Sequence, residues 1–132
     1  MNAIIPFLPY VILLTLIYLY ISFSVIRLRY KHKSPIGVKE SPELEYAVRG
    51  HGNFAEYTPL ALILLLLTVL TGANPYISHA IAVLLTAGRL FHAYCFVSKH
   101  NFVIRRYGMI MTFLSLIVSI SALSYIFINH LL

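Results

Sequence analysis

The chain has 132 residues, of which 60% are hydrophobic and only 11% are charged, and its mean hydropathy is +0.84. This apolar content is well above the roughly 45–50% of ordinary soluble domains, so it excludes a water-soluble globular fold and predicts an integral membrane protein. The formal net charge of +6 does not indicate nucleic-acid binding, because the basic residues are not interleaved with a soluble recognition fold.

Four apolar stretches follow one another along the chain. The first, residues 3–26, lacks the positive N-terminal region and the small-residue cleavage site of a signal peptide, so we expect it to remain as a membrane helix. The others, at 53–71, 76–97 and 107–128, are close to the roughly 20 residues that an α-helix needs to cross a bilayer. Together they predict an all-α, integral membrane four-helix bundle in which residues 1–132 form a single domain.

The connections between these stretches differ in charge. The first holds six basic residues: Arg27, Arg29, Lys31, Lys33, Lys39 and Arg49. The second, residues 72–75, is uncharged, whereas the third carries Lys99, Arg105 and Arg106. By the positive-inside rule the first and third connections face the cytoplasm. Both termini are then expected on the opposite side, which is the periplasm if the membrane is a bacterial inner membrane.

Two connections contain signals for where helices begin. Ser41 precedes Pro42 and the acidic residues Glu43 and Glu45, which is the pattern of an N-cap followed by a first helical turn. The second helix is therefore expected to begin there, before it enters the membrane. The residues Gly, Ala, Asn and Pro at 72–75 are expected to end that helix and begin the third.

Polar residues inside the second helix are the first candidates for function. Arg49, Asn53 and Glu56 are spaced at i, i+4 and i+7, which places them on one helix face, and Tyr57 lies at its edge. A charged residue at the centre of a bilayer helix costs about 2.5–3.5 kcal/mol, so Glu56 must face protein, water or a ligand. The alternative is an ion pair between Arg49 and Glu56, bridged by Asn53, with no ligand.

The third stretch repeats the pattern with Arg89 and His92 at i and i+3. Here the alternative interpretations are that Arg89 pairs with Glu56 of the neighbouring helix and that His92 is a core histidine with satisfied hydrogen bonds. No metal pair of the His-x-x-x-His kind, glycine-rich phosphate loop or Ser-His-Asp set is present, so no metal is expected. The single cysteine, Cys95, cannot form an intrachain disulfide and is expected to be a packing residue.

From Arg49 to Pro59 the sequence reads Arg-x-x-x-Asn-x-x-Glu-Tyr-x-Pro, which resembles the signature of the MAPEG family, the membrane-associated proteins of eicosanoid and glutathione metabolism. Three further segments agree in order: Arg27-Leu28-Arg29, Gly88-Arg89-Leu90-Phe91-His92 and Arg105-Arg106-Tyr107-Gly108. The resemblance covers essentially the whole chain and is greatest to the small bacterial members of the family.

The resemblance implies a homotrimer of four-helix subunits that binds glutathione at subunit interfaces, near the cytoplasmic side. Carried over by position, Arg27 would meet a glutathione carboxylate. Arg49, Asn53, Glu56 and Tyr57 would hold the remainder of the tripeptide, with Glu56 at its amino group.

The remaining matched positions concern the sulfur. His92 corresponds to a third-helix position that is His or Tyr in family enzymes, and Arg105, with Arg106 as the alternative, matches the arginine that stabilises the glutathione thiolate. The tyrosine that family enzymes carry one turn after His92 is replaced by Phe96.

The activity that the resemblance implies is that of a glutathione transferase or peroxidase toward apolar electrophiles that partition into the bilayer. Glutathione brings two carboxylates, an ammonium and a thiol, which require cationic donors, one acid and a cation near sulfur. The first alternative is a non-catalytic protein of the same fold that binds lipid or a partner. The second, a proton-coupled multidrug exporter, predicts an acidic residue in the first span, and this chain has none there.

Overall fold

The computed structural model describes residues 3–38, 40–96 and 101–132, and all regular elements within them are helical. Lys39, Val97 and Lys99, which belong to the predicted basic connections and third span, lie outside the described residues. A short 3-10 helix, η1 (Ile5–Phe7), is followed by α1 (Leu8–Lys31), α2 (Pro42–Leu70), α3 (Pro75–Tyr94) and α4 (Phe102–Leu131). The predicted all-α class with four long helices is therefore confirmed.

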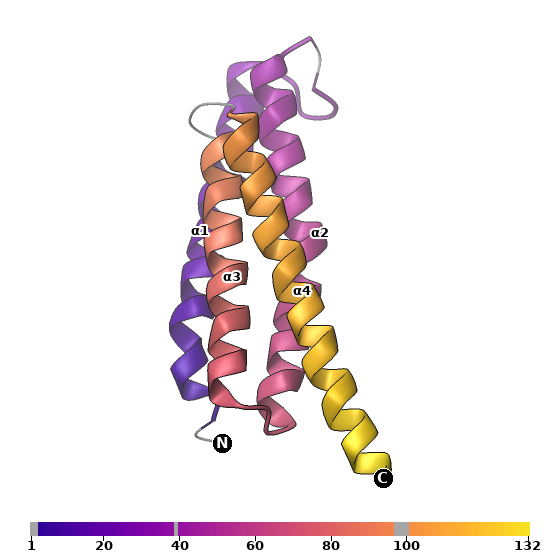
Figure 1. Cartoon of the computed structure of the whole chain (residues 1–132). Helices are drawn as coiled ribbons and strands as arrows, with labels where there is room; N and C mark the ends of the chain where they lie inside the picture. The colour runs from indigo at the N-terminus through magenta and orange to yellow at the C-terminus, as the bar shows by residue number, and fades with distance from the viewer. Residues whose placement is uncertain (1–2, 39, 97–100) are drawn as a thin grey trace.

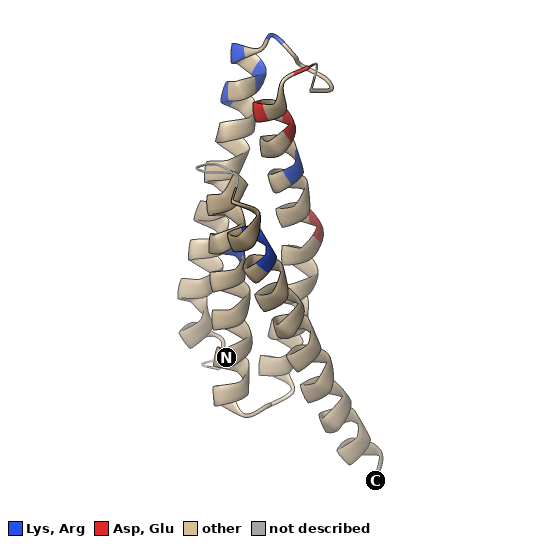
Figure 2. Ribbon diagram, turned by 45° about the horizontal axis from the view of Figure 1, so that its top comes forward, with Lys and Arg blue, Asp and Glu red and all other residues tan. Residues whose placement is uncertain are grey.

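The four helices run alternately in opposite directions (Figure 1). Both termini lie at the same end of the bundle as the short turn between α2 and α3, while the end of α1, the start of α2, the end of α3 and the start of α4 lie toward the opposite end. Charged residues gather toward that opposite end, and the half of the bundle nearer the termini has almost none (Figure 2). This asymmetry is the one on which the positive-inside rule depends.

Three of the four helices are long and apolar enough to cross a membrane by length and composition: the segment Ile5–Lys31, which joins η1 to α1, together with α2 and α4. The sequence predicted four spans, and α3 is the helix that is not among these three. Its 20 residues correspond to about 30 Å, but His79, Arg89 and His92 lower its hydropathy.

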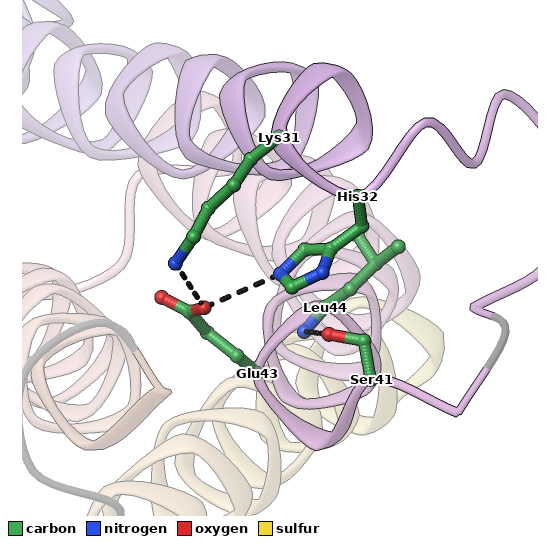
Figure 3. A network of polar contacts seen from close by, with 5 residues as sticks. All are labelled: Lys31, His32, Ser41, Glu43 and Leu44. Carbon is green, nitrogen blue, oxygen red and sulfur yellow. Dashed lines mark hydrogen bonds and ion pairs between the residues drawn. The ribbon is translucent and has the colours of Figure 1, made fainter.

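The end of α1 is joined to the start of α2 by polar contacts (Figure 3). The Ser41 Oγ accepts a hydrogen bond from the Leu44 N–H at 3.3 Å, which confirms the predicted N-cap. The Glu43 carboxylate lies 2.8 Å from Lys31 Nζ and 3.4 Å from His32 Nε2. Because these charges are exposed, the ion pairs contribute little to stability, and their main effect is to fix the loop.

The turn between α2 and α3 follows the predicted sequence signals. The α2 helix ends at Leu70, and Gly72 adopts a positive φ of 77°, which glycine tolerates without steric cost. The Asn74 side chain then caps α3 by accepting a hydrogen bond from the Tyr76 N–H at 2.9 Å. A short uncharged turn therefore reverses the chain at the end of the bundle that carries the termini.

The α3 and α4 helices approach each other closely at two glycines. A Cβ added to Gly88 would lie 2.8 Å from the Gly108 carbonyl oxygen, and a Cβ added to Gly108 would lie 2.8 Å from the Gly88 carbonyl oxygen. Such distances are too short for real Cβ atoms, so the two backbones touch only because neither residue has a side chain. This contact, the glycine crossing, brings α4 against the polar face of α3.

We predict that both termini face away from the cytoplasm, because the charged residues gather toward the opposite end of the bundle. A reporter that is active only in the periplasm should be active when fused after Leu132, and a reporter that is active only in the cytoplasm should be silent there. A matched fusion within the loop between α1 and α2 should behave in the opposite way. Cytoplasmic activity of the Leu132 fusion would contradict this topology.

Candidate functional site

Arg89 is the centre of a polar cluster inside the bundle. Its side chain is completely buried, with 0% of its surface exposed. Its Nε and Nη2 atoms donate to the Thr112 Oγ1 at 3.1 and 2.6 Å, and its Nη1 donates to the Asn53 Oδ1 at 2.9 Å. The guanidinium therefore joins α3 to α4 and α2, directly beside the glycine crossing, since Arg89 follows Gly88 in the sequence.

No carboxylate of the described residues neutralises the charge of Arg89. Within the part of the chain that the structure describes, the ion pairs join only Glu43 to Lys31 and His32. The two ion-pair alternatives drawn from the sequence are therefore wrong, because Glu56 pairs with neither Arg49 nor Arg89. A buried cation surrounded by neutral dipoles leaves a positive potential inside the bundle, which favours an anion nearby.

Asn53 is held by this cluster instead of by the ion pair that the sequence allowed. Its Oδ1 accepts from Arg89, and a longer contact of 3.5 Å joins Arg89 Nη1 to the Asn53 backbone oxygen. This orientation of the amide, which follows from the hydrogen-bond network, leaves its Nδ2 without an acceptor among the described residues. Because Asn53 is only half-buried, that amide group is available to a ligand.

Tyr57, like Asn53, lies next to Arg89. The Arg89 guanidinium carbon is 6.0 Å from the centre of the Tyr57 ring, and the ring makes an edge-on contact with Phe113 at 5.6 Å. Its aromatic body therefore packs between the buried cation and α4. Asn53 and Tyr57, which the sequence placed near each other on α2, are both turned toward α3 and α4.

His92 is buried, with 1% of its surface exposed, and its Nε2 has no hydrogen-bond partner within the described residues. The alternative interpretation, in which both ring nitrogens of His92 form hydrogen bonds within the core, is therefore wrong for Nε2 among the described residues. Its ring contacts Phe96 with a centroid distance of 4.8 Å. An unpartnered nitrogen at this place can donate to or accept from a bound ligand.

The structure distinguishes the two candidate arginines of α4. The guanidinium carbon of Arg105 lies 5.3 Å from the centre of the Phe96 ring, next to His92, whereas Arg106 makes no ring contact or ion pair among the described residues. Both side chains are exposed on the isolated subunit. Of the two, it is Arg105 that extends toward the cluster of Asn53, Tyr57 and His92.

Three predicted site residues are not brought into this cluster. Arg27, Arg49 and Glu56 are exposed on the subunit and form no hydrogen bond or ion pair in the described ranges. The sequence, in turn, did not single out Thr112, whose Oγ1 accepts from Arg89 and donates to the Gly108 carbonyl at 2.9 Å. The signal for it was the spacing of Gly108 and Thr112, four residues apart on the helix that faces Arg89.

Comparison with known proteins places this geometry in context. The MAPEG family pattern matches residues 7–125 of the chain. Over 113 residues the chain is 37% identical to the Inner membrane protein YecN of Escherichia coli K12, and the match covers 86% of each protein. The protein of the same name from Escherichia coli O6:H1 matches to the same extent. No solved structure matches.

Proposed function

Because the chain belongs to the MAPEG family, we propose that it is a membrane-embedded glutathione transferase or peroxidase acting on apolar electrophiles from the bilayer. The observation that carries the proposal is the cluster around Arg89, in which a buried cation with no carboxylate partner among the described residues holds the Oδ1 of the half-buried Asn53. Such a site favours an anionic, hydrogen-bonding ligand over a neutral lipid.

Glutathione matches the charges that the subunit presents. Its two carboxylates fit the guanidinium groups of Arg27 and Arg49, which can bind a carboxylate through two parallel hydrogen bonds. Its ammonium group fits Glu56, which has no protein partner in the described residues. The thiol would then lie toward His92 and Arg105.

The exposure of Glu56 and Arg49 on the isolated subunit supports an assembly in which another copy covers this face, and the family resemblance implies that this assembly is a homotrimer. A carboxylate at membrane depth cannot face lipid without a large cost in free energy, yet Glu56 is exposed on the isolated subunit. A neighbouring copy that covers this face of α2 would remove that cost and could bring its own Arg27 to the ligand. The site would then lie at the interface, near the cytoplasmic side of a bacterial inner membrane.

Arg105 would act on the sulfur. A guanidinium next to a thiol lowers the pKa of the thiol and increases the fraction of thiolate, which is the reactive nucleophile. In the transferase reaction the thiolate sulfur forms a bond to an electrophilic carbon, and the leaving group departs with its electron pair. The apolar electrophile would reach the sulfur from the bilayer.

The direct test is to incubate the purified protein in lipid discs with glutathione and an apolar aryl halide and to measure the conjugate. We expect glutathione to bind in a titration and conjugation to exceed that of empty discs. Absence of conjugation and of lipid-hydroperoxide reduction would favour the second candidate, a non-catalytic protein of this fold that binds lipid or a partner, whose support is the large exposed apolar surface of the helices.

We predict that Glu56→Gln weakens glutathione binding about ten- to a hundredfold, because a hydrogen bond to a charged group contributes about 1.5–3 kcal/mol. The melting temperature should change little, since Glu56 is exposed and forms no ion pair. Calorimetric titration and thermal unfolding give the two values. The matched control is Glu43→Gln, which removes a carboxylate in the first turn of α2, away from the proposed ligand, and should leave affinity unchanged. Equal affinities in the two variants would contradict the role of Glu56.

A further inference from the structure

Phe96 follows the end of α3 and is buried between three helices, with 6% of its surface exposed. On one side it packs directly against the backbone of α2 at Gly50. A Cβ added to Gly50 would lie 2.6 Å from the Phe96 Cγ and 2.7 Å from its Cβ, so the ring occupies space that only a glycine leaves open. The position of the ring is therefore fixed by contact with α2.

The other contacts of Phe96 are with functional candidates. The His92 ring lies 4.8 Å away at an interplanar angle of 41°, and the guanidinium carbon of Arg105 lies 5.3 Å from the Phe96 ring centre. A guanidinium within about 6 Å of an aromatic ring centre is attracted by the negative face of the ring. A phenyl ring has no hydrogen-bonding group, so its contribution here is through shape and this attraction.

Arg105 needs such a contact to have a defined position. It lies in the first turn of α4, its side chain is exposed, and none of its guanidinium nitrogens forms an ion pair in the described residues. A long side chain without partners samples many rotamers, and only a fraction of them would place its charge at the sulfur. Arg106, its neighbour, contacts no aromatic ring in the part of the chain that the structure describes.

We propose that Phe96 is a positioning residue, whose ring holds the Arg105 guanidinium beside His92 in the orientation that stabilises the bound thiolate. This inference rests on the proposed glutathione-dependent function. Phe96 replaces the hydroxyl-bearing residue of family enzymes, and in this chain the ring face, anchored on Gly50, orders the cation.

The first experiment compares Phe96→Leu and Phe96→Met, which fill similar space without a ring, with Phe96→Tyr, which keeps the ring. We expect the first two to lower kcat about two- to thirtyfold, the range of a cation–π contact, while KM for glutathione stays within about twofold. The pKa of the bound thiol, followed by thiolate absorbance, should rise in both variants and return toward the wild-type value in Phe96→Tyr. If Phe96 only stabilised the fold, these substitutions would not change the pKa of the bound thiol.

The control is Phe23→Leu, which changes a phenylalanine of α1 that is 65% exposed. Identical kcat and thiol pKa in Phe96→Leu, Phe96→Met and the control would overturn the proposal. A loss confined to KM would overturn it as well, because Phe96 would then act on binding instead of on the thiolate.

A second measurement is independent of catalysis. An arginine-selective dicarbonyl reagent, with modified peptides quantified by mass spectrometry, should modify Arg105 several-fold faster in Phe96→Leu than in the wild type, with Arg106 as the internal reference. An unchanged rate would refute the contact even if the protein is an active enzyme. A faster modification rate in a protein that shows no glutathione conjugation would confirm the contact between Phe96 and Arg105. It would also refute the proposed reaction and, with it, the role of Phe96 in that reaction.

Discussion

Arg105→Ala is expected to lower the rate of glutathione conjugation about a hundred- to a thousandfold, while glutathione affinity stays within a few fold. The carboxylates and the ammonium of glutathione would still be held by Arg27, Arg49 and Glu56. Removal of one preorganised charge-stabilising group costs about 2.7–4 kcal/mol in the transition state, which corresponds to this loss. Steady-state kinetics and a binding titration on the same preparation separate the two effects.

The pH dependence provides the control for this variant. Loss of the cation raises the pKa of the bound thiol, so less thiolate is present at neutral pH, and raising the pH should restore part of the rate. Arg106→Ala removes the adjacent charge and should have a much smaller effect, because Arg105 is the arginine of this pair that contacts the Phe96 ring. A large loss in Arg106→Ala with normal turnover in Arg105→Ala would reverse the assignment.

Gly88→Ala and Gly108→Ala are each expected to destabilise the protein by about 1–3 kcal/mol, the usual cost of forcing extra methyl groups into a well-packed contact. The added Cβ would lie 2.8 Å from a backbone carbonyl of the opposite helix in both cases, and a backbone cannot rotate away as a side chain can. The shift of α4 should also weaken the hydrogen bonds between Thr112 and Arg89. Denaturation of the protein in detergent or lipid discs measures the loss.

The chain supplies a matched control for these substitutions. Gly52 is also a helical glycine, but a Cβ added there would have no neighbour closer than the Glu56 Oε1 at 4.0 Å. Gly52→Ala should therefore be neutral or stabilise the protein by about 0.5–1 kcal/mol through helix propensity. If Gly88→Ala proves as well tolerated as Gly52→Ala, the glycine crossing is not a close contact in the folded protein.

Most of the fold was readable from the sequence, because the signals are local. Apolar runs predicted four long helices, and Ser41 and Asn74 predicted where two of them begin. The helices extend beyond the predicted spans because helical hydrogen bonding continues where the chain leaves hydrocarbon: α1 continues to Lys31 and α4 already starts at Phe102. Hydropathy marks the membrane boundary and does not mark the end of a helix.

The candidate site could be predicted from the sequence only in part, because the residues on one helix face do not reveal which other helix packs against that face. The spacing of Arg49, Asn53 and Glu56 predicted a shared face, yet Asn53 bonds to Arg89 while the two charged residues are exposed. The partner of Arg89 on α4, Thr112, is 23 residues further along the chain, and no local pattern connects them. The roles predicted for glutathione binding remain predictions that the variants above can test.

The burial of Arg89 also bears on how the protein is made. During synthesis α3 leaves the ribosome before α4, so its arginine is exposed before Thr112 exists to accept its hydrogen bonds. A lone arginine at the centre of a helix in lipid costs about 2.5–3.5 kcal/mol, and α3 is the long helix that falls short of a membrane span by length and composition among the described residues. The short turn between α2 and α3 and the glycine crossing between α3 and α4 favour insertion of α3 together with these two helices as one unit. A chain truncated before α4 should therefore be a poor substrate for the insertion machinery and a good one for membrane proteases.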